Sequence, residues 1–218
     1  MVRTGKKLRC LVLGLVLGGL LTALPATVSA QGVLYFLSLR KGIQTPSGDN
    51  AFNEWERNHG ALQNGREVHT TGVEMDVFSV SESGFGLGLG LEVHNYEKTF
   101  NFEDKNGVLP PEQVYISGNG VLFSLKTYFR FGDFLPYLGA GLGNYYLRFR
   151  EQQSGLNSSQ SVDEVYAFKV GARYTLGKFG MLVEAGSISA LTNITLRTGK
   201  TTLQAGGSYY LYGLSYLF

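Results

Sequence analysis

The sequence SYYLYGLSYLF, residues 208–218, indicates a β-strand, because apolar and aromatic side chains recur at every second position up to the aromatic Phe218. A period of two is the side-chain period of a β-strand. The residues that share one face are Tyr210, Tyr212, Leu214, Tyr216 and Phe218. Rings stacked along one face of a terminal strand indicate an outer surface that meets lipid.

This ending resembles the C-terminal strand of bacterial outer-membrane β-barrels. The resemblance implies that the same alternating residues form the assembly signal read by the barrel-assembly machinery: Tyr210, Tyr212, Leu214, Tyr216 and Phe218. A barrel of this kind needs an export signal at the other end of the chain.

The N-terminus has the pattern of such a signal. Four bases and no acid in residues 1–9 precede an apolar run over 11–24, and the small residues of V-S-A follow at 28–30. This arrangement predicts a secretory signal peptide over 1–30, cleaved between Ala30 and Gln31. The run is too short for a transmembrane anchor, and Cys10 precedes it, which disfavours a lipoprotein. Residues 31–218 then form one outer-membrane barrel domain.

Removing residues 1–30 changes the charge of the chain. The sequence holds 19 Lys and Arg against 17 Asp and Glu, and the signal peptide carries four of the bases, which leaves 15 against 17. A nucleic-acid partner is therefore not expected. No cysteine remains to form disulfides, so hydrogen-bond closure of a sheet is a candidate for holding the fold together.

Eight segments alternate with period two, and their connections are by turns short and long. Tight turns are predicted at 81–84, 132–133 and 177–178, and longer loops at 45–67, 97–113, 151–164 and 192–204. This pattern predicts an all-β, eight-stranded antiparallel up-and-down transmembrane barrel with short periplasmic turns and four extracellular loops. The predicted strands are 33–44, 68–80, 85–96, 114–131, 134–150, 165–176, 179–191 and 205–218.

The polar faces of these strands carry balanced charge. If they point inward, four acids and four bases form an interior ion-pair network. Its predicted members are Glu74, Asp76, Glu92, Lys126, Arg130, Lys169, Arg173 and Glu184. A gated solute path lined by some of these groups is the alternative.

Aromatic side chains collect at the short-turn ends of the apolar faces. They predict a periplasmic girdle at the headgroup level, made of Phe85, Phe131, Phe134, Tyr174, Phe179, Tyr216 and Phe218. Tyr146, Tyr166 and Tyr210 form a sparser band toward the loops. A soluble lipocalin-like barrel has no reason to sort rings by height, and this favours the membrane barrel.

Three glycines in LPYLGAGLGN, residues 135–144, imitate part of a dinucleotide fingerprint, but the strand-like YYLRFR follows where a helix is required. We expect inward glycines to make room for large groups such as Tyr137 and Tyr145. The stretch FGDFLPYLGAGLGNYY, 131–146, resembles the small outer-membrane β-barrel family that includes OmpX-like, OmpA transmembrane-domain-like and OmpW-like proteins.

Enzymatic function is not expected. His59, His69 and His94 lack the H-x-S arrangement of lipid A deacylase barrels, although a lipid-modifying enzyme stays a remote alternative. His94 and Glu92 are too few for a metal site, and no cofactor is expected.

The first loop carries Phe52 and Trp55 at helical spacing. We expect it to fold back over the barrel mouth, with an exposed contact for a host or ligand as the alternative. The sequence as a whole predicts a structural or surface-interaction barrel, whose partners are outer-membrane lipid and a host or envelope component at the loops. An OmpW-like narrow channel for small hydrophobic molecules is the alternative function.

Overall fold

The protein folds into one closed β-barrel. The computed structural model describes residues 32–47, 50–103, 112–196 and 199–218, so the predicted signal peptide and its cleavage site at Ala30 and Gln31 lie outside the described residues. Eight antiparallel strands close in the order β1-β10-β7-β6-β5-β4-β3-β2. They are β1 (Val33–Pro46), β2 (Val68–Val80), β3 (Phe85–Phe102), β4 (Glu112–Phe129), β5 (Phe134–Glu151), β6 (Asn157–Leu176), β7 (Phe179–Ser189) and β10 (Gly207–Leu217).

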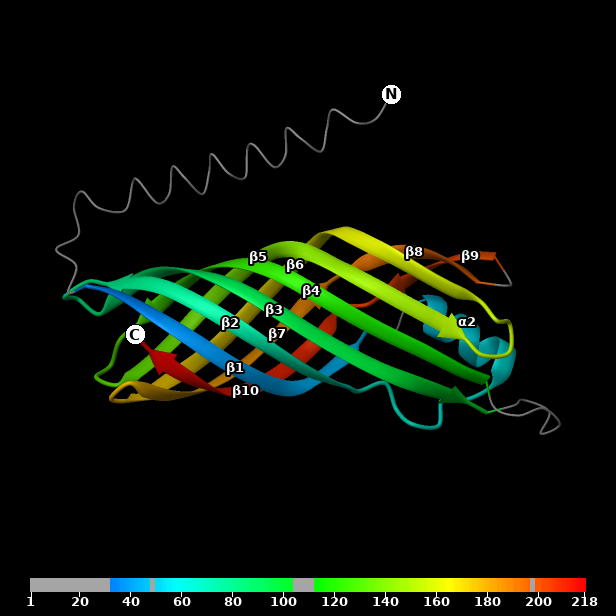
Figure 1. Ribbon diagram of the computed structural model, residues 1–218, viewed down its shortest axis with the longest axis horizontal. Coiled ribbons are helices and arrows are strands. Elements are labelled where there is room, and N and C mark those ends of the chain that lie inside the picture. The colour runs from blue at the N-terminus through cyan, green and yellow to red at the C-terminus, as the bar shows by residue number, and fades with distance from the viewer. Residues whose placement is uncertain (1–31, 48–49, 104–111, 197–198) are drawn as a thin grey trace, which may run out of the picture.

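The ring closes between the first and last strands. Phe36 pairs with Leu217 and Ile43 with Tyr210, so the terminal stretch that indicated a strand lies directly against β1. Three tight turns lie at the end where β1 begins and β10 stops, and each contains a glycine with positive φ: Gly84, Gly132 and Gly177. Figure 1 shows β1 starting and the chain ending at this same end of the barrel.

The outer face is apolar over the middle of the barrel and the inner face is polar. Phe123, Leu125 and Phe168 are among the exposed outward residues, whereas Glu74 and Lys126 are buried inside. A soluble barrel would have the opposite polarity, because monomeric soluble proteins rarely expose so large a contiguous apolar surface. The eight-stranded transmembrane barrel is thus confirmed, and a lipocalin-like barrel is wrong.

Four adjacent strands are longer than a membrane crossing needs. β3, β4 and β5 have 18 residues each and β6 has 20, against 11 in β7 and β10. A tilted strand crosses the bilayer in about 9–11 residues. The predictions for the third and sixth strands were therefore too short, and 97–102 and 157–164 continue the sheet beyond the loop-side boundary.

Two further elements lie at the loop end. Helix α2 (Asn50–His59) follows β1, and a two-stranded hairpin of β8 (Leu191–Leu196) and β9 (Gly199–Gln204) lies between β7 and β10. The hairpin replaces the predicted loop 192–204. Figure 1 shows α2 and the hairpin together at the end opposite the short turns.

Candidate functional site

The lumen is filled in three layers. A buried aromatic cluster lies toward the short turns, a layer of ion pairs follows, and a larger apolar cluster occupies the mouth. An eight-stranded barrel is just wide enough for its own side chains to fill it.

The ion-pair layer is built from side chains on opposite walls. Glu74 lies 2.7 Å from Lys126 Nζ and 3.4 Å from Arg40 Nη1, and Asp76 lies 2.8 Å from Arg173 Nη2. All of these side chains are buried. A charge buried in the lumen is tolerated only when paired, so these contacts hold the walls of the barrel together.

Glu92 and Glu184 complete the network. Glu92 contacts Arg40 and Lys169, each at 2.5 Å. Glu184 lies 3.2 Å from Arg40 Nη1, and it accepts hydrogen bonds from the Tyr137 and Tyr209 hydroxyls at 2.7 and 3.0 Å. The layer contains four acids and four bases, so its formal charge is zero.

The prediction of Arg130 as a network member was wrong. β4 ends at Phe129, and Arg130 is exposed in the following turn, where its Nε donates to the Gly132 carbonyl at 3.1 Å. The alternation of the strand determines whether a side chain lies inside or outside the barrel only as far as the strand pairing continues.

Arg40 takes the fourth basic position, and the sequence analysis missed it. Ser38 and Arg40 alternate with the outward Leu37 and Leu39, which was a usable signal. The next residue, Lys41, is charged and exposed and so obscures the pattern.

Inward glycines give the large groups their space, as the sequence predicted. A Cβ on Gly171 would lie 2.5 Å from the Tyr137 ring, and one on Gly120 would lie 2.7 Å from the Tyr145 ring. Gly139 leaves room for the Lys126 and Lys169 side chains. No helix begins after the fingerprint glycines Gly139, Gly141 and Gly143, because β5 continues to Glu151, so the dinucleotide fingerprint is excluded.

The aromatic cluster closes the lumen below the ion pairs. Phe36 and Phe78 stack with centroids 5.4 Å apart, and Phe78 stacks on Tyr128 at 4.5 Å. The Arg173 guanidinium lies 4.0 Å from the centre of the Phe36 ring. This cation–π contact joins the aromatic layer to the ionic layer.

Helix α2 closes the mouth. Phe52 and Trp55 are buried; Phe52 packs edge-on against Phe100 at 5.0 Å, and Trp55 lies 6.0 Å from Phe102. The Trp55 indole also donates to Glu151 Oε1 at 2.6 Å. The first loop thus folds back over the barrel mouth, as expected.

The β8–β9 hairpin also packs over the mouth, and with α2 it forms a lid. Ile194, Leu196 and Leu203 point into the mouth core. Thr192 donates to Gln160 of β6 at 2.8 Å. The lid therefore joins the first and fourth predicted loops into one packed unit.

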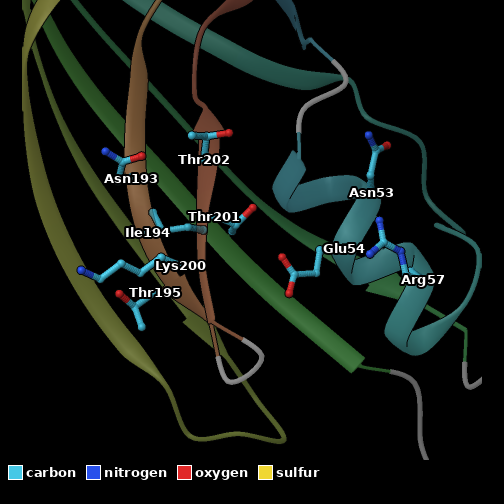
Figure 2. A pocket seen from close by; sticks show the side chains of 9 residues that line it. All are labelled: Asn53, Glu54, Arg57, Asn193, Ile194, Thr195, Lys200, Thr201 and Thr202. Carbon is cyan, nitrogen blue, oxygen red and sulfur yellow. The ribbon is translucent and has the colours of Figure 1, made fainter.

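A polar cavity of about 740 Å³ lies between the two parts of the lid. α2 contributes Asn53, Glu54 and Arg57, and Asn193, Thr195 and Lys200 are among the hairpin residues. Figure 2 shows the helix beside the hairpin, with Glu54 between them. Its volume lies within the range of small-molecule sites, about 300–1,000 Å³, and its lining is more polar than is usual for them.

The three histidines do not come together. His69 is exposed on the outside of β2, His94 is buried in the lumen, and His59 ends the lid helix. His94 Nδ1 lies 3.0 Å from Glu92, but the described residues contain no group of three His, Cys, Asp or Glu placed to hold a metal.

Among the described residues, no helix has the length and hydropathy to cross a membrane.

The predicted girdle residues lie at the short-turn ends of their strands. Phe179, Tyr216 and Phe218 form an edge-on series with centroids 5.3 and 5.0 Å apart. Phe134 pairs with Tyr174, Phe131 bridges to Phe134, and Phe85 packs against Phe129. The proposed assembly residues Tyr210, Tyr212, Leu214 and Phe218 are exposed on the outer face of the closing strand, and Tyr216 is half-buried.

The apolar exterior, the paired strand ends and the filled lumen define a small outer-membrane-type β-barrel whose interior is closed by its own side chains. No protein-family model and no curated protein sequence matches the chain.

Among solved structures, the fold is similar to Neisserial surface protein A, at 12% identity over 86% of this chain and 100% of that one, with a TM-score of 0.48. The fold is also similar to Ail of Yersinia pestis, at 13% identity over 86% of this chain and 99% of that one, with a TM-score of 0.47. A third similar structure is the N-terminal β-barrel domain of Pseudomonas aeruginosa OprF, at 13% identity over 87% of this chain and 100% of that one, with a TM-score of 0.43. At these identities the similarity is one of fold alone.

Proposed function

We propose that this protein is a non-enzymatic bacterial outer-membrane barrel that acts at the cell surface, where its extracellular lid and loops contact a host, envelope or neighbouring component. The closed lumen is the observation that carries the proposal. A solute crossing the barrel would have to displace the lid, break the contacts of Arg40 with Glu92 and Glu184, and part the rings beneath them. The OmpW-like channel function therefore has less support.

The polar cavity of the lid is the proposed contact site. It joins the first loop with the fourth, so two segments that are distant in sequence present one surface to the outside. Residues 97–102 of β3 and 157–164 of β6 form the ends of long strands at this same end of the barrel. A partner with hydrogen-bonding groups fits this lining better than an apolar one.

The function is tested by two measurements on the folded protein. In planar bilayers we expect no stepwise conductance, and steady single-channel steps would contradict the proposal. On whole cells, a double Arg57→Ala, Asn193→Ala variant is expected to lose adhesion to host cells or envelope fragments. The control is Lys178→Ala, which removes an exposed charge from a turn at the opposite end.

Export and assembly form a separate part of the proposal. The signal peptide over 1–30 would be cleaved after Ala30, and the barrel-assembly machinery would recognise the terminal strand. Deleting Phe218 is expected to reduce the amount of heat-modifiable barrel in the outer membrane and leave signal cleavage intact. Unchanged assembly would exclude Phe218 as part of the signal.

A further inference from the structure

A second cavity at the mouth has a different chemistry from the polar cavity of the lid. It has a volume of about 330 Å³ and lies between the end of α2 and the loop-side ends of β4 and β5. Its walls include Trp55, His59, Glu112, Glu151 and Ser154. This volume is near the lower end of the range for small-molecule sites.

Two buried carboxylates face this cavity. Glu112 is 2% exposed and Glu151 is 5% exposed. Glu151 accepts from the Trp55 indole and from Ser154 Oγ, each at 2.6 Å, and these donors fix its position. No salt bridge joins either carboxylate to a base within the described part of the chain.

Glu112 is the less satisfied of the two. Its Oε1 accepts from the Gln153 backbone N–H at 3.1 Å, whereas its Oε2 is buried with no hydrogen-bond partner among the described residues. Burying an ionised carboxylate without a cation is costly. In the ion-pair layer every carboxylate has a basic partner, so Glu112 is an exception that a ligand would explain.

The neighbouring groups suit an organic cation. The Trp55 ring is held beside Glu151 by its own hydrogen bond, and an indole face attracts an ammonium or guanidinium group. The described residues contain no cluster that suits a metal ion, and the cavity is larger than a bare ion needs. Exposed Asn58 and Gln153 leave its rim open to the outside.

We propose that this cavity binds a primary ammonium or guanidinium group on a slender aliphatic chain, with Glu112 as the main ionic partner and Trp55 as the aromatic wall. The group can come from a free polyamine or from a lysine or arginine side chain of a partner protein. The site requires only the folded mouth, so its failure would leave the proposed surface function unchanged.

The chain offers its own probe, because Trp55 is its only tryptophan. Folded full-length barrel in detergent is titrated with cadaverine while the intrinsic tryptophan fluorescence is recorded. We expect a saturable change in the millimolar range or below, with none for the neutral diol 1,5-pentanediol. An equal response to both compounds, or no response to cadaverine, would overturn the proposal.

Two variants connect the signal to the site. Glu112→Gln keeps the shape of the side chain and removes its charge, and should weaken cadaverine binding by about tenfold or more. The matched control is Glu97→Gln, an exposed carboxylate on the outside of β3, which should leave the affinity unchanged. Equal loss in both variants would mean that general surface charge attracts the probe, and the proposal would fail.

A further variant keeps the test valid if the Glu112→Gln protein does not fold. Gln153→Lys places an ammonium group at the rim while keeping the backbone bond to Glu112, and should compete with cadaverine for the same carboxylate. Heat-modifiable migration verifies folding of each variant. Wild-type affinity in Gln153→Lys would contradict the site.

Two further titrations separate the ligand sources and the metal alternative. A short capped peptide with one lysine is compared with cadaverine; tighter binding of the peptide indicates a protein partner, and tighter binding of cadaverine indicates a free polyamine. Calcium alone is then added. A Glu112-dependent response to calcium with none to either amine would make this a metal site and overturn the proposal.

Discussion

The membrane-level part of the barrel and its extracellular mouth have opposite polarity on the same strands. In the lower half of β3, Leu91 and Val93 point outward while Glu92 is buried inside; in the upper half, Glu97 is exposed outside while Phe100 is buried inside. The alternation continues without interruption, and only the polarity of the two faces exchanges. The position along β3 at which the two faces exchange polarity therefore marks the boundary between lipid and water.

β4 shows the same exchange. Leu125 is exposed and Lys126 buried at membrane level, whereas Ser117 is outward and Ile116 is buried at the mouth. Apolar side chains face lipid in one region and a water-excluding core in the other. The membrane span is therefore marked by outward hydrophobicity and not by the length of the strand.

The largest expected effect comes from removing one member of the ion-pair layer. Arg40→Ala leaves Glu74, Glu92 and Glu184 short of a cation and should lower the free energy of unfolding by about 3–5 kcal/mol. Urea unfolding followed by the heat-modifiable gel shift measures it. Arg130→Ala is the control, expected within about 0.5 kcal/mol of wild type because Arg130 is exposed. A larger loss in Arg130→Ala than in Arg40→Ala would contradict the structure.

The polarity exchange itself is tested by placing one charge at two heights on the same face of β4. Leu125→Arg faces lipid and should cost about 2–4 kcal/mol, whereas Ser117→Arg lies above the boundary and should cost about 0–1 kcal/mol. Refolding equilibria in lipid vesicles give both values. Equal costs would show that the boundary does not fall between these positions.

Trp55→Phe should affect the mouth and spare the membrane-level barrel. It removes the indole bond to Glu151 and leaves that buried carboxylate one donor fewer, at a cost of about 1–3 kcal/mol. We expect faster proteolysis of the lid and unchanged heat-modifiable migration. If the variant lost both the protease resistance of the lid and the heat-modifiable migration of the barrel, the mouth and the barrel would unfold as one unit.

The smallest expected effect is at the attachment of the first loop to β3. Lys98 Nζ donates to the carbonyls of Asn64, Gly65 and Glu67 at 2.8, 3.0 and 2.6 Å. Lys98→Met should cost about 1 kcal/mol, since the carbonyls lie near water and can rehydrate. Hydrogen exchange of residues 61–67 should quicken, while exchange in β10 should stay as in wild type.

The sequence predicted the strand number, the ring closure and the direction of each face, because a two-residue period that is apolar on one side is a direct record of a two-sided environment. The predicted strand ends were wrong where the outward face changes from apolar to polar. Residues 97–102 and 157–164 appeared to be loops because their outward face becomes polar above the bilayer, although their inward Phe100, Phe102 and Val162 continue the alternation.

The sites were less predictable than the fold. The charge balance of the lumen was found, but Arg130 was named in place of Arg40, since periodicity identifies a face and not the height at which a strand stops. Glu112 and Glu151 were not singled out at all. Their proximity depends on the pairing of β4 with β5 and on the docking of α2, which no short-range pattern contains.

The pairing of β1 with β10 determines when the barrel can close during synthesis of the chain. Phe36 pairs with Leu217, so the ring can close only after β10 has been synthesised. Until then both edge strands present unpaired N–H and C=O groups, which invite aggregation. A truncated copy lacking the terminal strand would keep those edges open permanently. The strands that are synthesised first must therefore keep an unpaired edge until β10 is present to pair with β1.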